Sequence, residues 1–280
     1  MIFKYVFFVI TALLIVASNL LAHEEPPKTL REKELAITEA NKIKALNIKS
    51  SVAWKVVNNN KFKYLQTKYD EDGFVSSIIL FKEDGTVDSK EVYDRDERGN
   101  MFLYSNYDSN DQIVEQIEYA FDRKGRVKAS TNYENKKIDS SFSYEFNDLN
   151  NTVVFKKYKA TEELEYSIDY IYSGKADITD LVDVKKYNPF GKLELSVVYE
   201  YSEDGKITAK TVYSSDSALV HKFLYVYEND LKAQITKILP ENKIGFVQNF
   251  KYDDNGKLLQ ITALDADNKV TSQIDYDYEI

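Results

Sequence analysis

The sequence lacks cysteine altogether and is poor in several other residue types, with two histidines, two methionines, one tryptophan and four prolines in 280 residues. Without cysteine the chain forms no disulfide, no thiolate zinc site and no cysteine nucleophile. His23 and His221 are too few for a multi-histidine metal site, and they leave little room for a Ser-His-Asp triad. The net charge of −9 argues against binding through nucleic-acid phosphates. We therefore expect no nucleic-acid partner, no metal and no cofactor.

Aromatic residues, by contrast, are abundant. Tyrosine occurs 22 times and phenylalanine 15 times, while 43% of the residues are hydrophobic and 30% are charged. Such a composition belongs to a folded chain rather than a disordered one, and its aromatic content favours strands over helices. A secreted protein without disulfides then needs a large or repetitive non-covalent core.

Residues 1–22 have the pattern of a secretory signal peptide. Lys4 precedes an apolar run from Tyr5 to Ala17, and small residues follow at Ser18 and Ala22. A basic start, an apolar centre and small residues before the cleavage site define such signals. The sequence predicts cleavage after Ala22 or Ser18, a secreted or periplasmic location, and no transmembrane span in the mature chain. The alternative is that the apolar run stays in place as an uncleaved anchor.

Residues 23–47 are expected to form a leader followed by a short amphipathic helix. Thr29 and Glu32 have the spacing of a capping box, in which each side chain bonds an amide at the start of the helix. Leu35, Ile43 and Leu46 recur at helical spacing. We expect this helix to cover an open end of the domain that follows, with partner binding as the alternative.

From residue 48 to residue 280 one pattern repeats. A large apolar residue followed by a polar turn recurs about every 13 residues, the length of one strand plus one tight turn. These anchor residues are Val57, Tyr69, Phe81, Tyr93, Tyr107, Phe121, Tyr133, Phe146, Tyr158, Tyr172, Tyr187, Tyr201, Tyr213, Tyr227, Leu239, Tyr252, Leu264 and Tyr278. Most glycines fall in the turns, in clusters such as DEDG and DDNG that suit hairpins. Connections this short join only antiparallel neighbours.

Alternation within the strands predicts one apolar and one polar face. Tyr166, Ile168, Tyr170 and Tyr172 share one face, whereas acidic residues and serines occupy the other. Heavily aromatic strands recur about every 26 residues, so that one repeat is a hairpin. The strands between them are expected to present small residues on the same apolar face, namely Val127, Ala129, Thr131, Ile207, Ala209 and Thr211.

Several turns also carry a family resemblance. Tyr69-Asp70 to Gly73, Phe121-Asp122 to Gly125 and Tyr252-Asp253 to Gly256 each contain an aromatic residue, an aspartate and a turn glycine. The chain from about residue 57 resembles YD-repeat (RHS-type) proteins, whose unit is a Tyr-Asp pair followed by a glycine turn. Phe146-Asn147 departs from this pattern, and no variable toxin tail is present. The resemblance implies a repeat architecture in a secreted or envelope protein, without toxin activity.

We therefore predict an all-β protein, a long antiparallel meander of about 18 strands in 26-residue hairpins, coiled or barrel-like, with a short N-terminal helix. An apolar face this wide must be covered by coiling into a shell, closing into a barrel or folding into two layers. An outer-membrane barrel is disfavoured, because the polar faces are densely charged and neither end carries long loops.

The chemistry that this sequence allows is limited. Acidic turns such as Asp70 to Asp72 would suit calcium, but aspartate and glycine are also the ordinary turn residues. Two of the many carboxylates could form a glycoside hydrolase site, yet none stands out from its repeat partners. His221 falls on the aromatic face and is expected to pack there. The interpretation is therefore that the chain is not an enzyme.

Candidate binding residues are Trp54, Tyr187 and Phe190, whose rings could stack on a sugar. Trp54 lies in the first strand, and the other two lie where the spacing of the repeat is widest. The favoured function is a non-catalytic, secreted or periplasmic β-repeat protein that binds a partner or forms part of the cell envelope. A protein or cell-surface partner is expected. The alternatives are a carbohydrate-binding module and an acid-pair hydrolase.

Overall fold

A computed structural model describes residues 30–57, 60–173, 180–254 and 256–279. Helix α2 (Leu30–Ala45) precedes all the strands, and a short 3-10 turn, η2 (Pro240–Asn242), joins two of them. The first nine strands are β1 (Ser50–Val57), β2 (Asn60–Tyr69), β3 (Val75–Phe81), β4 (Val87–Arg95), β5 (Met101–Tyr107), β6 (Ile113–Phe121), β7 (Val127–Glu134), β8 (Lys137–Asn147) and β9 (Thr152–Lys159). The next nine are β10 (Leu164–Ser173), β11 (Asp180–Tyr187), β12 (Leu193–Tyr201), β13 (Ile207–Ser214), β14 (Leu219–Glu228), β15 (Leu231–Leu239), β16 (Lys243–Tyr252), β17 (Leu258–Leu264) and β18 (Val270–Glu279).

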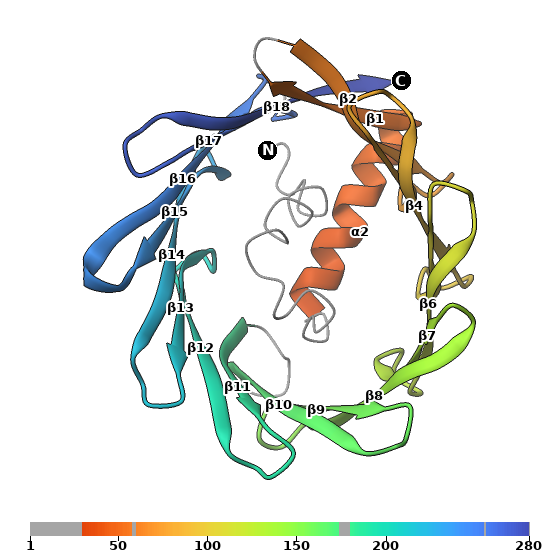
Figure 1. The fold of residues 1–280 in the computed structure, drawn as a ribbon, viewed down its shortest axis with the longest axis vertical. Helices are drawn as coiled ribbons and strands as arrows, with labels where there is room; N and C mark the ends of the chain where they lie inside the picture. Colours follow the sequence, from red (N-terminus) through yellow and green to blue (C-terminus); the bar gives the residue numbers. More distant parts are fainter. Residues whose placement is uncertain (1–29, 58–59, 174–179, 255, 280) are drawn as a thin grey trace.

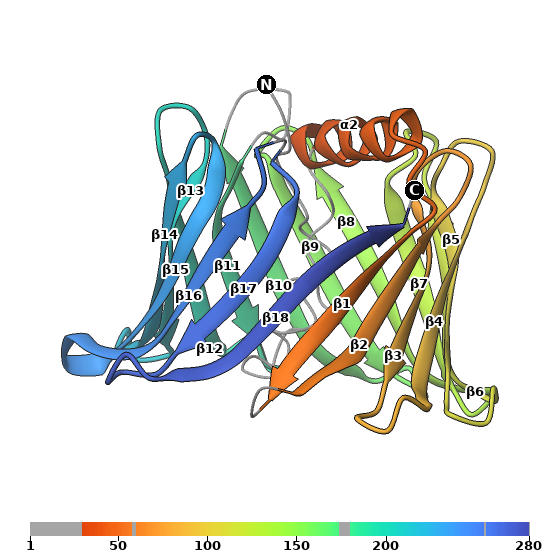
Figure 2. The same cartoon turned by 90° about the horizontal axis from the view of Figure 1, so that it is seen from above.

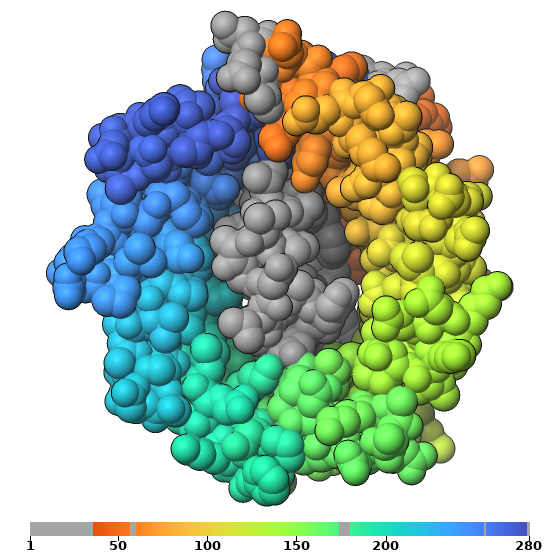
Figure 3. Space-filling model, viewed as in Figure 1, coloured from red at the N-terminus to blue at the C-terminus, as the bar shows by residue number. Residues whose placement is uncertain are grey.

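The strands form one closed antiparallel barrel. Each strand pairs with its neighbours in the sequence, and β1 pairs with both β2 and β18, for example Ala53 opposite Tyr276. Figure 1 shows the ring down its axis, and the space-filling view in Figure 3 shows its wall running continuously from β1 round to β18. The predicted all-β meander of about 18 strands with an N-terminal helix is confirmed. Among the closures that the sequence leaves open, the closed barrel is the one adopted.

The strands end where the aromatic anchors predict, because local turn chemistry stops them. In the turn between β2 and β3, the Asp70 amide donates to the Phe74 carbonyl and the Gly73 amide donates to the Asp70 carbonyl. The Asp70 carboxylate accepts bonds from the amides of Asp72 and Phe74. Gly73 has a φ of +84°, a conformation that glycine adopts without penalty. The same bonds recur at most of the other tight turns.

The apolar side chains point into the barrel. In β10, burial alternates strictly, with Tyr166, Ile168 and Tyr170 buried and the residues between them half-exposed. Helix α2 lies within the outline of the ring in Figure 1 and across one end in Figure 2. Burial, with a contribution from Glu39 of this helix, raises the pKa of Tyr69 and of Tyr278. The face that carries these tyrosines is therefore the inward one, where side chains converge.

Two groups of inward residues form the core. The first runs along β14 to β18 and on to β1–β3, and contains Ala53, Leu65, Ile78, Phe223, Ile235, Phe250, Leu258, Ile261, Ile274 and Tyr276. The second runs along β8 to β13, and contains Phe142, Val153, Phe155, Tyr166, Ile168, Tyr170, Tyr172, Leu181, Val184, Val197 and Val212. This apolar lining stabilises the barrel without a disulfide.

Four of the small residues of the intervening strands, Ala129, Thr131, Ala209 and Thr211, do not lie on that face, contrary to expectation. Val197 is in the inward core and pairs with Val212, so the neighbouring pair of Val198 and Thr211 points outward. The pairing of Glu118 with Thr131 likewise places Thr131 outward. Most strand pairs contain a register shift near one end. Counting by twos from an anchor therefore assigns the wrong face to these strands.

Helix α2 rests on the end of the barrel formed by the β2–β3 turn. Ala40 and Ile43 of the helix are 3% and 5% exposed. Gly73 approaches so closely that a Cβ atom there would overlap the carbonyl oxygen of Ala40. An exposed ion pair of 2.9 Å joins Lys44 to Asp72 of the same turn. The helix therefore covers one end of the barrel, as the sequence predicts.

Candidate functional site

The outward face of the barrel is rich in polar residues that pair with one another, with apolar side chains such as Val198 and Val226 exposed among them. The Gln234 amide donates to Asn249 at 3.0 Å, and the Gln260 amide donates to Asp275 at 2.9 Å. Lys222 forms an ion pair of 3.0 Å with Glu200 across the same surface. Cross-strand pairs of this kind are what a face in contact with water carries. Much of the described outward face therefore pairs with itself, although the Trp54 indole N–H on β1 has no hydrogen-bond partner.

The inward face combines lysines with aromatic rings. Across β12 to β16, the strand register places Tyr199, Lys210, Phe223, Lys237 and Phe246 in consecutive opposite positions. We call these five residues the lysine–aromatic row. The Lys210 Nζ lies 5.7 Å from the Tyr199 ring centre, and the Lys237 Nζ lies 5.8 Å from Phe223 and 6.0 Å from Phe246. Each ammonium group is thus held against ring faces, an arrangement that stabilises a cation away from bulk water.

The same arrangement continues on the preceding strands. Lys157 of β9 pairs with Phe142 and Tyr166, and Lys186 of β11 lies 3.8 Å from the Tyr166 ring centre. Lys157 also forms an ion pair of 3.3 Å with Glu165. Inward lysines therefore occur on four alternate strands, β9, β11, β13 and β15. This part of the inner wall carries a series of positive charges.

The pKa of His221 reflects the positive charge of this wall. Its ring packs edge-on against Phe223, with ring centres 5.1 Å apart, so it lies beside the lysine–aromatic row. Burial, followed by the positive charges of Lys237 and Lys210, lowers its pKa to about 4. The imidazole is therefore neutral at pH 7, and it is a packed residue as predicted. Further along β15, burial lowers the pKa of Lys232 to about 8.

A different wall of the barrel carries acids and amides. Asn106 of β5 lies opposite Glu91 of β4 on one side and opposite Glu115 of β6 on the other. The Glu91 carboxylate accepts a hydrogen bond from the Tyr93 hydroxyl, and the Asn132 side-chain amide donates a hydrogen bond of 3.3 Å to Glu115. The inner surface is therefore polarised, with acids on β4–β6 and lysines on β9–β15.

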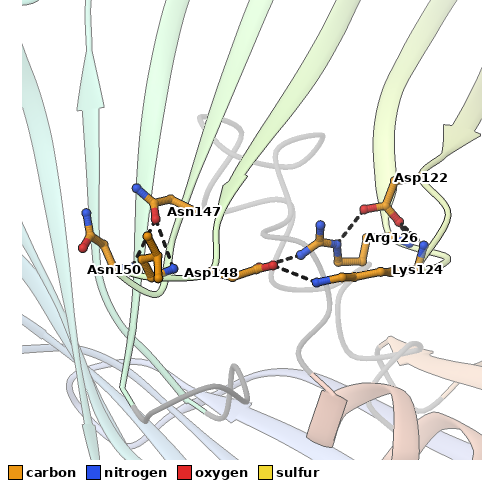
Figure 4. Close-up of polar contacts among 7 residues, drawn as sticks. Asp122, Lys124, Arg126, Asn147, Asp148 and Asn150 are labelled. Atoms are coloured by element: carbon orange, nitrogen blue, oxygen red, sulfur yellow. Dashed lines mark hydrogen bonds and ion pairs between the residues drawn. The ribbon is translucent and has the colours of Figure 1, made fainter.

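The rim beside α2 is built from tyrosines and ion pairs that link successive turns. The hydroxyls of Tyr201, Tyr252 and Tyr278 each donate to a carbonyl 20 residues earlier, on the neighbouring strand. Asp148, in the β8–β9 turn, forms ion pairs of 2.8 Å with both Lys124 and Arg126 of the β6–β7 turn (Figure 4). These contacts have a structural explanation, since they lock adjacent hairpins together.

The three candidate binding residues do not converge. Trp54 lies on β1, which is not an edge strand, and its ring takes a cation–π contact from Lys61 at 5.4 Å. Tyr187 ends β11, and Phe190 lies in the following turn with 92% of its surface exposed. Trp54 is thus separated by many strands from the other two. A common sugar site formed by all three does not exist, although each remains a candidate by itself.

The acidic turns use their carboxylates on their own backbones. Asp96 accepts bonds from the amides of Arg98 and Asn100, and its pKa is lowered by hydrogen bonds led by the Asn100 side chain. Asp108 and Asp265 accept bonds in the same pattern. Within the described ranges, no group of three or more histidines and acids is arranged to hold a metal ion.

The sequence contains one signal for the inward lysines. Lys157, Lys186, Lys210 and Lys237 recur at roughly the 26-residue period of the hairpins. The face of each slender strand must be known before these lysines can be placed inside, and register shifts hide it. Among the described residues, no helix is sufficiently long and apolar to cross a membrane.

The sequence matches no protein-family model and no curated protein. A solved porin-like protein from Bacteroides uniformis ATCC 8492 aligns with 83% of this chain and 98% of its own, at 9% identity and a TM-score of 0.43. A porin-like protein from Bacteroides vulgatus ATCC 8482 covers the same shares at 12% identity and a TM-score of 0.32. A Photorhabdus luminescens Tc holotoxin pore aligns over 77% of this chain and 11% of that one, with a TM-score of 0.26. The 18-strand barrel formed by this chain resembles these porin-like proteins in fold.

Proposed function

We propose that the chain is a secreted or periplasmic, non-catalytic binding protein that holds its ligand against the inward face of its barrel. The observation that carries this proposal is the contrast between the two faces. Outward polar groups pair with one another, whereas the inward wall presents half-buried lysines and rings. A barrel of this strand number is in general wider than its own side chains can fill.

The location is supported by two features of different kind. The signal-like segment, residues 1–22, lies outside the described residues, so its support comes from the sequence pattern alone. The outward face, with its glutamines, lysines and acids, suits water rather than hydrocarbon, because a membrane barrel carries an apolar outer band. We expect the mature protein, with Asn19 or His23 as its first residue, in the soluble envelope or secreted fraction. Recovery in the membrane after an alkaline wash would contradict this location.

The binding proposal can be tested with single cysteines, because the natural chain has none. Ser272 and Gln273 are adjacent on β18 and are both half-buried, but Ser272 points inward and Gln273 outward. The protein is first screened on a glycan array to find glycans that it binds. Ser272→Cys and Gln273→Cys variants, each labelled with an environment-sensitive fluorophore, are then titrated with those glycans. A change confined to the Ser272→Cys label is expected. A change confined to the Gln273→Cys label, or an array without any hit, would overturn binding at the inner face.

A second candidate function rests on Glu91 and Glu115. Both acids lie on the inner face, two strands apart and flanking Asn106. Two carboxylates across a gap are the requirement of a glycoside hydrolase. Burial, followed by the charges of these two acids, raises the pKa of the nearby Tyr104. The natural chain and the Glu91→Gln variant are each incubated with a glycan that the array identifies. Formation of new reducing ends by the natural chain but not by the variant would favour hydrolysis over binding alone.

A further inference from the structure

The positive charge of the inner wall is concentrated on strands that lie away from the covering helix. In Figure 1, α2 lies toward the β1–β6 side of the ring, and β12–β16 form the opposite side. Lys237 and Phe246 also lie near the η2 end of β15 and β16, which is the end opposite the β2–β3 turn and α2. The row is therefore placed on a part of the inner surface that the described helix does not cover.

The row has a definite repeat. Neighbouring strands are about 4.8 Å apart, so Lys210 and Lys237, separated by β14, stand about 10 Å from each other. Their ring neighbours Tyr199, Phe223 and Phe246 fall at the same interval, offset by one strand. A pyranose unit is comparable in length to one strand spacing. A lysine on every second strand therefore matches a chain of sugars that carries an acidic group at least on every second sugar.

The charges of the row are not neutralised by neighbouring acids. Among the described residues, no ion pair involves Lys210 or Lys237, while Lys222 on the outward face of β14 is paired with Glu200. The lowered pKa of His221 has burial as its main cause and these two lysines as further causes. Two partly desolvated cations without acidic partners form a favourable site for anions.

We propose that the lysine–aromatic row binds an anionic glycan chain, whose acidic groups meet Lys210 and Lys237 while its sugar rings lie along Tyr199 and Phe246. This inference rests on the proposed function and names its ligand class. Phe223 is 7% exposed and serves as the support between the two lysines. An acidic peptide is the less suitable occupant, because it offers no sugar faces to lie along Tyr199 and Phe246.

The test uses calorimetric titration of the purified secreted protein with oligogalacturonate, an anionic glycan, and with the same oligomer after its carboxyl groups are reduced to alcohols. Polyglutamate serves as the acidic peptide. Binding of oligogalacturonate alone, weakened by added salt, is expected. Equal binding of the reduced oligomer would overturn the assignment to charge and leave inner-face binding intact. Stronger binding of polyglutamate, or no binding of any probe, would overturn the glycan assignment.

Variants locate the site. The double variant Lys210→Met and Lys237→Met keeps side-chain length and removes both charges, and about a tenfold loss of affinity per lysine is expected. Lys222→Met is the matched control, because Lys222 lies on the intervening strand but faces outward, and it should change affinity less than about twofold. Replacing both lysines with arginine should restore binding. An equal loss in the control and the double variant would refute the row as the site.

Discussion

The contact between Gly73 and helix α2 makes a strong prediction about the attachment of the helix. A Cβ atom at Gly73 would overlap the Ala40 carbonyl oxygen and lie 2.8 Å from the Ala40 carbonyl carbon and 3.0 Å from the Lys44 nitrogen. All three are backbone atoms, so no side-chain rotation relieves the overlap. Gly73→Ala should therefore push the helix away from the β2–β3 turn.

The magnitude follows from a matched glycine. Gly85 has a φ of +82°, close to the +84° of Gly73, but no atom lies within 4 Å of a Cβ atom placed there. Gly85→Ala should cost only the backbone strain, about 1 kcal/mol of unfolding free energy. Gly73→Ala adds the partial uncovering of Ala40 and Ile43, for which burial of one aliphatic side chain suggests about 2 kcal/mol more.

The assay compares both variants with the natural chain by denaturant unfolding and by hydrogen exchange of the α2 amides. Gly73→Ala should lose roughly 3 kcal/mol, and the α2 amides should exchange faster while those of the barrel stay protected. Gly85→Ala should leave α2 exchange unchanged. If the two variants lose equal stability and α2 exchange is the same in both, then the helix does not rest on this turn and the reasoning fails.

Three further predictions concern single side chains. Burial raises the pKa of Glu39 from 4.5 to about 7, so the folded state keeps a proton that the unfolded state loses as the pH rises. The free energy of unfolding should therefore fall as the pH rises from 4.5 to 7, by at most about 3 kcal/mol. Glu39→Gln should remove this pH dependence in denaturant unfolding measured at several pH values. Asp148→Ala breaks the half-exposed bridges to Lys124 and Arg126 and should cost under about 1 kcal/mol in low salt and less in high salt, by denaturant titration. Phe155→Ala empties a position with 0% exposure and should cost about 3–5 kcal/mol; a loss below about 1 kcal/mol would contradict its place in the core.

The strands of this fold can be predicted from the sequence because local turn chemistry determines where each one ends. Tyr69, Phe121 and Tyr252 end strands because the aspartate that follows each one organises a turn with its own carboxylate. Closure is not readable in this way. The pairing of Ser51 with Tyr278 joins the two extremes of the domain, and the alternation in each strand would be the same in an open coil.

The site was less predictable than the fold. Trp54 is a ring in the first strand, and Tyr187 and Phe190 lie where the spacing of the repeat is widest, but the structure leaves these three candidates apart. Lys210 and Lys237 do not stand out in the sequence because they follow the repeat. Deciding that these lysines face inward requires the register shifts in β12–β13 and β14–β15, which tertiary pairing determines.

The repeat itself bears on whether the lysines serve a function. In a barrel of identical hairpins, a residue type kept at one position of the repeat becomes a series of like side chains on one wall. Like charges in such a series repel one another. The architecture does not demand lysine at these places, since Ser130 lies opposite Phe142 on β7 where Lys157 does on β9, and Ala263 occupies an inward position on β17. Lys210 and Lys237, which have no ion-pair partner among the described residues, are therefore the two lysines to which we assign the proposed anionic ligand.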